Sequence, residues 1–346
     1  MVSYLIKTAT DTNWHEFFSQ ILSTYEPGVF EWGQPVGQDT LVLWLNNQPL
    51  TAKKFYADLL SHANGISWFH GLYELYGIKQ VTQVSSATQD SSLDGWLLIG
   101  THATGEYWLD PSGRVHGFFS LKQDRLLLAS GLLEFCRILL DQEALVFDSA
   151  GEYKAVFDKQ GEFLAKIQER RVKVTKQHDP KSPWGLYQEA QSLFLVRDNE
   201  GAVSCLKEAI LLDDKSSLLF EELAIVYERM ELFKEAFTAY KNAAATSLSE
   251  EQKHLRLNHA LNLPLDGERQ QEAIKIAEEF PSYVPFLIEK AKQARKGGDV
   301  EKTSSYLELL ELTLDPSLDK AHVEQSKNLI LEIKQFLRQK NKFSVL

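Results

Sequence analysis

The sequence of 346 residues predicts an α+β domain, with an antiparallel sheet and flanking helices, followed by an all-α superhelical solenoid of helical hairpins. Three observations favour this fold class. A chain of this length exceeds one core of ordinary size, so two domains are expected. In the first 148 residues the apolar spacing changes from helical to strand-like and back. From residue 183 onward, apolar and small residues recur at a fixed period.

Two helices and a strand are expected before residue 66. Apolar residues between positions 13 and 25 share one face of a helix: Trp14, Phe17, Phe18, Ile21, Leu22 and Tyr25. Residues 40–45 form a short apolar run, which predicts a strand. Thr51 can cap a second helix, which ends at Asn64-Gly65 because both residues accept the left-handed conformation of a helix terminus.

Four further strands are expected in an antiparallel meander, at residues 96–99, 106–109, 115–119 and 126–129. Between the second and third of these, residues 110–113 (DPSG) have the composition that a type I turn prefers. Ser130 then begins a helix whose apolar face includes Phe135 and Cys136. Residues 1–148 are therefore predicted to form the α+β domain.

Residues 149–182 are predicted to be a basic connector. Its cations between positions 164 and 181 are Lys166, Arg170, Arg171, Lys173, Lys176 and Lys181. Glu169 and Asp179 are the acids of the same stretch, which closes with helix-breaking residues at 178–183 (HDPKSP). We expect a solvated linker. Contact with nucleic acid or with the acidic N-terminal domain is the alternative.

Small and aromatic residues after residue 183 recur 34 positions apart. One set is Ala190, Leu193, Ala202, Leu206 and Ala209, and the next is Ala224, Tyr227, Ala236, Tyr240 and Ala243. Alanine lets two antiparallel helices approach closely, and a ring beside it fills the remaining space. This pattern resembles the tetratricopeptide repeat. The resemblance implies that residues 183–346 form a right-handed superhelix, closed by a capping helix at residues 318–343.

Two further, more divergent units are expected, the third at Ser249, Ala260, Ala273 and Ala277 and the fourth at Ala291, Leu307 and Leu310. The resemblance also implies a concave groove that binds a protein or peptide. Its lining would come from the first helix of each unit: Tyr187, Gln191, Phe194, Glu221, Ile225, Glu228, Lys292 and Arg295. Acids on one part and cations on another suit a peptide with both signs of charge. The lysine and asparagine residues that hold a C-terminal carboxylate in chaperone-binding relatives are missing from this sequence, so a receptor for chaperone tails is not expected.

The α+β domain contains an ordered set of short patterns. They are Phe55-Tyr56, Leu59-Leu60, Asn64-Gly65, Leu75-Tyr76-Gly77, Leu97-Leu98-Ile99-Gly100, Gly105-Glu106, Leu109-Asp110, Gly113-Arg114-Val115, Ala129-Ser130 and Leu133-Glu134-Phe135. Over residues 50–145 this order resembles the SUKH superfamily, which is rich in bacterial toxin-immunity proteins. The resemblance implies a domain that binds a partner and catalyses nothing.

Charge and composition narrow the partners. Residues 1–150 hold 8 Lys and Arg against 16 Asp and Glu, a balance of −8, within a net charge of −11 for the chain. Such a domain would repel nucleic acid and suits a basic protein, although acidity also serves solubility alone. The 2 cysteines are too few for a disulfide framework. The sequence shows no membrane span and no secretion signal, so a cytoplasmic location is expected.

No cofactor or catalytic centre is expected. His102, Glu106, Asp110 and His116 could be read as a metal site, but the capping of turns and a polar, solvent-facing position account for these residues better. Phosphate-binding and nucleophile motifs are absent.

The function we predict is that of a non-enzymatic immunity protein that captures a toxin domain. Its docking face is expected on the α+β domain, at Asp90, Asp94, Glu106 and Asp110. The first alternative is a scaffold or regulatory adaptor in which the solenoid binds the partner. The second is an enzyme in the N-terminal domain. The sequence leaves the identity of the partner and the oligomeric state open.

Overall fold

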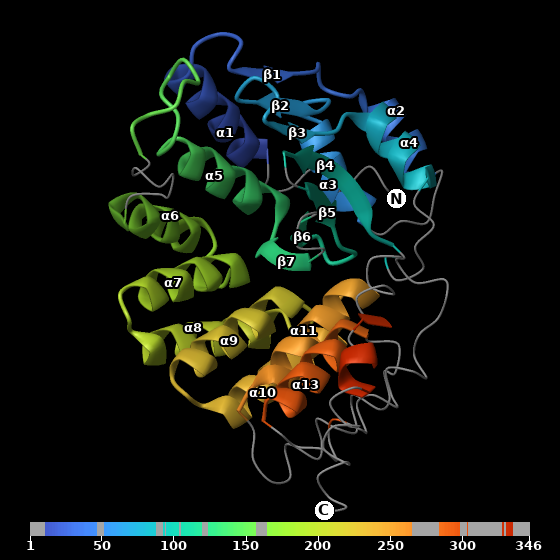
Figure 1. Cartoon of the computed structure of the whole chain (residues 1–346). Coiled ribbons are helices and arrows are strands. Elements are labelled where there is room, and N and C mark those ends of the chain that lie inside the picture. The colour runs from blue at the N-terminus through green and yellow to red at the C-terminus, as the bar shows by residue number, and fades with distance from the viewer. Residues whose placement is uncertain are drawn as a thin grey trace, which may run out of the picture. The chain divides into compact units, whose positions relative to one another are not determined.

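The computed structural model describes residues 11–46, 52–87, 93, 95–103, 105–119, 124–156, 165–264, 284–297, 303, 327–328 and 330–334. The chain forms two compact units, Met1–Arg256 and Leu257–Leu346. The first unit contains the sheet and the first helical hairpins together (Figure 1). The domain boundaries expected at residues 148 and 182 stay predictions, because a compact unit can contain more than one domain.

The part of the first unit before residue 150 combines helices and short strands. Its helices are α1 (Asp11–Thr24), α2 (Gln38–Asn46), α3 (Lys53–Leu60), α4 (Ile78–Ala87) and α5 (Leu132–Glu143). Its strands are β1 (Phe30–Trp32), β2 (Ile66–Trp68), β3 (Tyr73–Leu75), β4 (Leu97–His102), β5 (Gly105–Leu109), β6 (Val115–Phe119) and β7 (Asp124–Ala129). The strands form one antiparallel meander in the order β1 to β7, so every strand pairs with its neighbours in sequence.

The main core lies between the sheet and helices α1 and α5, which cover one of its faces (Figure 1). The ring of Phe17 on α1 packs against that of Trp68, with 6.1 Å between ring centres, and the ring of Phe135 on α5 packs against that of Tyr107, with 4.8 Å between ring centres. All four side chains are buried. The helix expected at residues 13–25 is therefore confirmed, except that Leu22 of its apolar stripe is 69% exposed.

The strand expected at residues 40–45 is wrong, because this run lies within helix α2. Leu41 and Trp44 are buried three positions apart, whereas Leu43 between them is 63% exposed. Trp44 also donates its indole Nε1–H to Thr82 Oγ1 of α4 at 3.0 Å. A short apolar run has no periodicity that separates a strand from a helix turn. The sequence also gave no signal for the three-residue strands β1–β3 or for α4.

The other expected strands are confirmed as β4–β7, with ends within three residues of the prediction. The turn at residues 110–113 is also confirmed. The amide of Gly113 donates to the carbonyl of Asp110 at 2.9 Å, and Gly113 has φ +88°. A side chain there would strike the ring of Phe55, so both the backbone and the packing require glycine.

Part of the expected connector is a helix. Residues 165–178 form α6 (Ala165–His178), in which Val172 and Thr175 are buried. The expectation of a solvated linker is wrong for this stretch, because α6 packs between α5 and the first repeat helix. Gln142 of α5 donates through Nε2 to Thr175 Oγ1 at 2.6 Å and to Gln188 Oε1 at 3.1 Å. A buried polar network therefore joins three successive helices.

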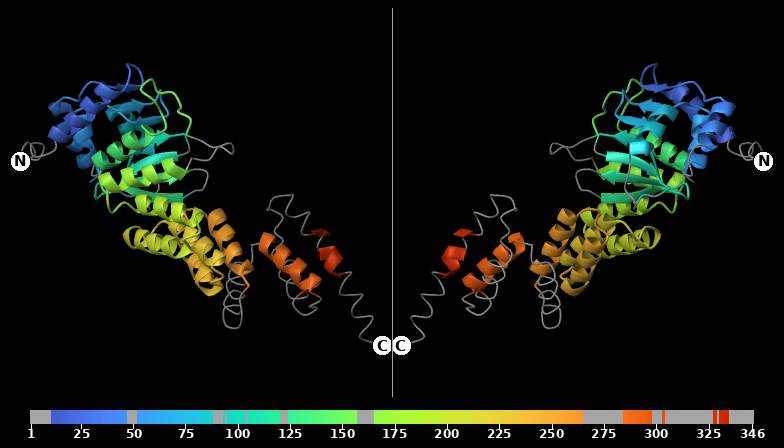
Figure 2. Two further views of the ribbon diagram at one scale, coloured as in Figure 1. Left: turned by 90° about the vertical axis from the view of Figure 1, so that its left-hand side faces the viewer. Right: turned by 90° about the vertical axis from the view of Figure 1, so that its right-hand side faces the viewer.

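Two helical hairpins follow, α7 (Pro183–Leu195) with α8 (Asn199–Leu212) and α9 (Ser217–Arg229) with α10 (Phe233–Ala245). Helices α5 to α10 each pack against the next in a single stack (Figures 1 and 2). The alanines predicted at helix contacts are at most 2% exposed: Ala190, Ala202, Ala209, Ala224, Ala236 and Ala243. The register predicted from the sequence is confirmed.

The turns inside the two hairpins have the same backbone conformation. Arg197 has φ +67°, and its equivalent Glu231 has φ +59°. After α7 the amide of Asp198 donates to the carbonyl of Leu193 at 2.9 Å, the six-to-one hydrogen bond that ends many helices. Glycine usually occupies this left-handed position, so both turns hold a strained side chain.

Helix α11 (Glu250–Asn262) begins in the first unit, and the second unit contains α13 (Val284–Lys296). Ala260 belongs to the third predicted repeat and Ala291 to the fourth, and both side chains are fully buried. The other positions predicted for these units, Ala273, Ala277, Leu307 and Leu310, lie outside the described residues. Most of the expected capping helix at 318–343 does so too.

Candidate protein-binding faces and the junction between sheet and repeats

The predicted first-helix side chains of the first hairpin contact one another or helix α9. Gln191 donates through Nε2 to the hydroxyl oxygen of Tyr187 at 2.7 Å, and that hydroxyl donates to Glu222 Oε1 of α9 at 3.2 Å. Burial, with the nearby carboxylates of Glu222 and Glu221, raises the pKa of Tyr187, so the phenol stays protonated and can donate. The guanidinium of Arg229 lies 4.4 Å from the ring centre of Phe194.

Three predicted residues come from α9. Ile225 is half-buried on the face of this helix. Glu228 accepts a hydrogen bond from the hydroxyl of Tyr240 at 2.5 Å. Burial and then this carboxylate raise the pKa of Tyr240. Glu221 accepts from Arg256 Nε at 3.1 Å, so its charge serves an internal ion pair. Tyr187 and Phe194 of α7 thus contact α9 through Glu222 and Arg229, and a partner-binding role for the predicted residues stays a prediction.

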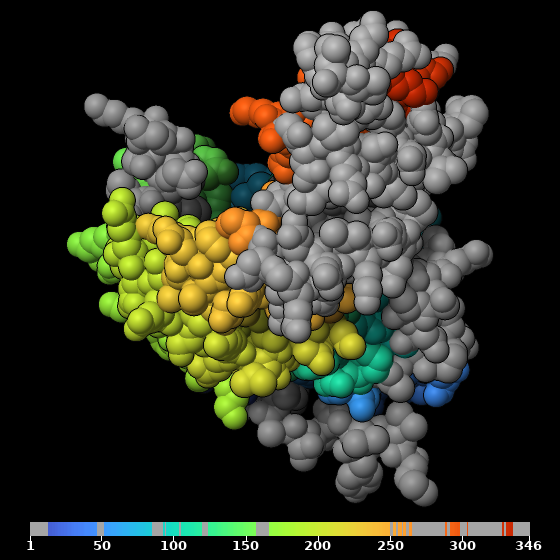
Figure 3. All heavy atoms as spheres, turned by 60° about the horizontal axis from the view of Figure 1, so that its bottom comes forward, coloured from blue at the N-terminus to red at the C-terminus, as the bar shows by residue number. Residues whose placement is uncertain are grey.

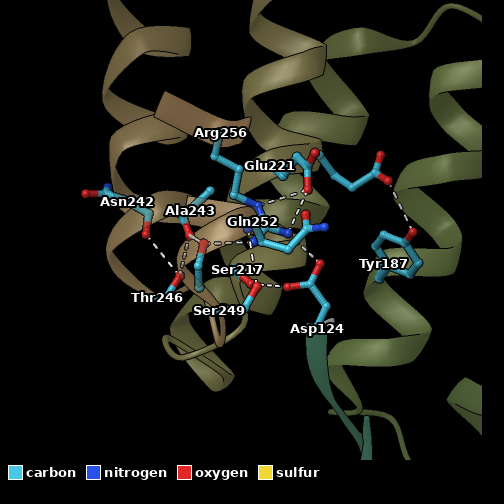
Figure 4. A network of polar contacts seen from close by, with 12 residues as sticks. Asp124, Tyr187, Ser217, Glu221, Asn242, Ala243, Thr246, Ser249, Gln252 and Arg256 are labelled. Atoms are coloured by element: carbon cyan, nitrogen blue, oxygen red, sulfur yellow. Dashed lines mark hydrogen bonds and ion pairs between the residues drawn. The ribbon is translucent and has the colours of Figure 1, made fainter. Parts of the chain in front are cut away.

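Arg256 is the centre of a buried polar network that sequence reasoning missed (Figure 4). Its Nη2 lies 2.5 Å from Asp124 Oδ2 at the start of β7 and 2.9 Å from Glu221 Oε2. Its Nη1 donates to Ser247 Oγ at 2.8 Å, and Asp124 also accepts from the hydroxyl of Ser217. The side chains of Arg256 and Asp124 are 1% and 0% exposed. No local motif announces this pair, because 132 positions separate its members.

The backbone of β7, the last strand of the sheet, is hydrogen-bonded to the loops before α7 and α9. The amide of Leu127 donates to Asp213 Oδ2 at 2.8 Å, and the carbonyl of Leu128 accepts from Ser182 Oγ at 2.7 Å. The amide of Ser130 donates to Asp179 Oδ2 at 2.6 Å. An edge strand with unpaired backbone groups invites other chains to pair with it. In Figure 3 the surface of the hairpins meets the teal surface of the sheet strands.

In the second unit, Lys292 is exposed and Arg295 is half-buried. Arg295 donates through Nη1 to Glu332 Oε2 at 2.6 Å. These two residues and those of α7 and α9 belong to different units, so a single groove that combines their charges stays a prediction.

Asp110 is wrong as a docking residue, because it is 1% exposed and holds its own turn together. It accepts from the amides of Ser112 and Arg114 at 2.8 and 3.0 Å and from His116 Nε2 at 3.2 Å. Burial opposes ionisation, but the hydrogen bonds from His116 and Arg114 outweigh it and lower the pKa of Asp110. Glu106 is half-buried. Asp90 and Asp94 lie outside the described residues.

The four residues weighed as a metal site do not come together. His102 packs against Tyr107 at 4.8 Å, whereas His116 packs against Trp96 at 4.6 Å and bonds Asp110. In the described parts of the chain, no three His, Cys, Asp or Glu side chains are placed to hold a metal ion. Nor does any described helix have the length and apolar character to cross a membrane.

The hairpins α7–α10 have the spacing and the buried alanines that are typical of tetratricopeptide repeats. Comparison with solved structures finds likeness to the MamA protein, at 19% identity over 37% of this chain and 66% of that one, with a TM-score of 0.28. PilF of Pseudomonas aeruginosa matches at 14% identity over 57% and 80%, with a TM-score of 0.31.

A third solved structure is YrrB, described as a TPR protein with an unusual peptide-binding site. It matches at 18% identity over 45% of this chain and 97% of that one, with a TM-score of 0.23. The chain matches no protein-family model and no curated protein.

Proposed function

We propose that the chain is a non-catalytic scaffold or adaptor that binds another protein through the first-helix faces of α7 and α9. One observation carries this proposal. The small residues of the repeats are buried between the helices, whereas Tyr187, Gln191, Phe194 and Ile225 remain half-buried on the first-helix side. A stack of hairpins built in this way presents a continuous side for an extended or helical partner.

Co-purification from the native host tests the proposal. Ile225→Asp places a charge on the first-helix face, and Leu211→Asp makes the same kind of change at an 85% exposed position of α8. We expect the tagged wild-type chain and Leu211→Asp to retain one defined partner, and Ile225→Asp to lose it. If both variants are folded and both keep the partner, binding at the first-helix face is contradicted.

A finer proposal concerns the sheet domain, which we infer to be SUKH-like and to serve immunity against a toxin domain. The patterns that suggested the family pack against one another. Tyr56 donates its hydroxyl to the carbonyls of Tyr76 and Ile99 at 2.6 and 3.2 Å, and Asn64 Oδ1 accepts from the amide of Ile78 at 2.8 Å. The acidic balance of this domain supports a basic partner. A cytoplasmic location stays a prediction.

Co-expression with the product of the adjacent gene separates immunity from a scaffold role. The full chain is the form to use, because β7 is bonded to the repeats and residues 1–150 alone would expose this strand. Rescue of growth by the full chain supports immunity. A neighbouring product that is harmless when expressed alone contradicts the immunity proposal and leaves the scaffold role in place.

A further inference from the structure

One side chain from each of the strands β1 to β6 lies in a row across one face of the sheet. The strand register pairs these residues directly, and partners in antiparallel strands project from the same face: Glu31, Ser67, Glu74, Thr101, Glu106 and Phe118. Glu31 is exposed and the other five are half-buried. The neighbouring row, which includes Phe30 and Trp68, is buried toward α1. Part of one sheet face is therefore accessible, and carboxylates alternate with hydroxyls along it.

Two of the three carboxylates of the row, those of Glu74 and Glu106, accept hydrogen bonds from neutral donors. Gln80 Nε2 donates to Glu74 Oε1 at 3.0 Å, and Trp108 Nε1 donates to Glu106 Oε2 at 2.9 Å. These bonds orient the two carboxylates without neutralising their charge. Adjacent strands lie about 4.8 Å apart, so successive acids of the row stand about 10 Å apart. Three negative charges, two of them oriented by hydrogen bonds, thus cross the first five strands.

A surface hollow lies at the β1 end of the row. It has a volume of about 230 Å³, and Glu31, Ser67 and His70 line it together with Gly28, Val29 and Gly71. This volume is below the roughly 300–1,000 Å³ of pockets for small-molecule ligands. It suits a single long side chain of a partner, with the carboxylate of Glu31 beside it. The hollow is a second observation beside the charge pattern, and its shape favours a partner with a protruding side chain.

The opposite end of the row is aromatic. Trp96 lies 6.2 Å from Phe118, ring centre to ring centre, and the guanidinium of Arg125 on β7 lies 5.5 Å from the Trp96 ring. Both rings are half-buried. Aromatic residues and arginine are enriched in the central parts of protein interfaces. The row therefore has a hollow at its β1 end, spaced carboxylates along its length and aromatic rings at its other end.

We propose that this row is a docking surface for a basic protein segment. Lysine or arginine side chains of the partner pair with Glu31, Glu74 and Glu106, one of them enters the hollow beside Glu31, and an apolar residue packs on Phe118. Charge complementarity carries the choice of partner, since the domain that holds the row has a balance of −8. This surface is separate from the first-helix faces of the repeats, so it goes beyond the function proposed above.

A fluorescein-labelled peptide of alternating lysine and alanine is the probe, titrated against the full chain by fluorescence anisotropy. The wild type should bind it, with an affinity that falls as salt is added. Replacing Glu31, Glu74 and Glu106 with glutamine keeps their shape and should weaken binding by about tenfold or more. The corresponding lysine variant should abolish binding. Circular dichroism checks that each variant is folded, and the glutamine variant carries the test if the lysine variant is not.

A charge-matched control separates this row from the acidity of the whole chain. Glu200, Glu208 and Glu235 are exposed on the second helices α8 and α10. Their replacement with glutamine should leave the affinity of the peptide unchanged. Equal weakening by the row and control sets, or no binding by the wild type, overturns the proposal.

Discussion

Replacing Arg256 with methionine removes the cation that links the sheet to the repeats. The guanidinium faces the carboxylates of Asp124 and Glu221 and also donates to Ser247. Methionine keeps much of the apolar stem, so packing changes little while the charge and the hydrogen bonds disappear. The variant therefore isolates the polar part of the junction.

The expected loss is large because Asp124 stays buried without its cation. Two unit charges 4 Å apart interact by about 4 kcal/mol at an effective dielectric constant near 20. Breaking one partner of a buried pair costs about 3–5 kcal/mol, since the remaining charge is left uncompensated. We expect Arg256→Met to lower the free energy of unfolding of the first unit by about this amount. Arg137→Met is the control: its guanidinium lies 3.7 Å from Glu16, whose side chain is 71% exposed, and the loss should be about 0–1 kcal/mol.

Urea unfolding, followed by tryptophan fluorescence, measures both variants. The double variant Asp124→Asn/Arg256→Met should be more stable than the sum of the two single losses predicts, by about 1 kcal/mol or more, because the second change removes the stranded charge. If Arg256→Met costs no more than Arg137→Met, or if the two changes at the junction add without coupling, the buried ion pair does not hold the sheet to the repeats.

Three further outcomes follow from the packing and the titrating groups. Ala236→Leu should overpack the contact between helices and cost about 1–3 kcal/mol, whereas Lys234→Leu should cost little; equal losses in thermal unfolding would mean a wrong repeat register. Arg197→Gly should raise stability by about 0.5–1 kcal/mol by relieving a left-handed side chain, and Arg197→Ala should give no such gain. Burial lowers the pKa of His116, and hydrogen bonds lower the pKa of Asp110, so on acidification the unfolded chain takes up protons before the folded chain does and the free energy of unfolding decreases as the pH is lowered. His116→Gln should make this decrease smaller between about pH 7 and pH 5.5. An unchanged pH profile would contradict a neutral, buried imidazole.

The repeats were the most predictable part of the fold. Ala202 and Ala236 occupy equivalent helix contacts, and a small residue is needed wherever two helices approach closely. This requirement acts at fixed spacing in the sequence, so it can be read without a structure. The strands β4–β7 were predictable for a similar reason, since their apolar runs are bounded by turn residues.

The short elements were not predictable. Strands β1–β3 have three residues each, too few for an alternating pattern, and their place in the sheet depends on pairing with β4. The run at residues 40–45 was misassigned because a short apolar run fits a strand and a helix equally well, and the hydrogen bond from Trp44 to Thr82 on another helix cannot be seen in the sequence. Tertiary contacts decided these cases.

The candidate sites divide in the same way. Tyr187, Gln191 and Phe194 could be placed from the repeat register alone. Asp110 was misjudged because an acid in a turn can serve its own backbone and the neighbouring His116 instead of a partner. The pair of Asp124 and Arg256 and the row that begins at Glu31 depend on strand register and on contacts between distant segments, which a local pattern cannot show.

Site-specific photocrosslinking in the native host tests most directly whether the chain binds a protein through its repeats. A benzophenone amino acid replaces Gln191 on the first-helix face or Leu211 on the exposed side of α8. We predict one defined protein adduct from position 191, which is absent from position 211 and is lost when Ile225→Asp is added. Adducts of equal yield from both positions, or an adduct at 191 that survives Ile225→Asp, would contradict it.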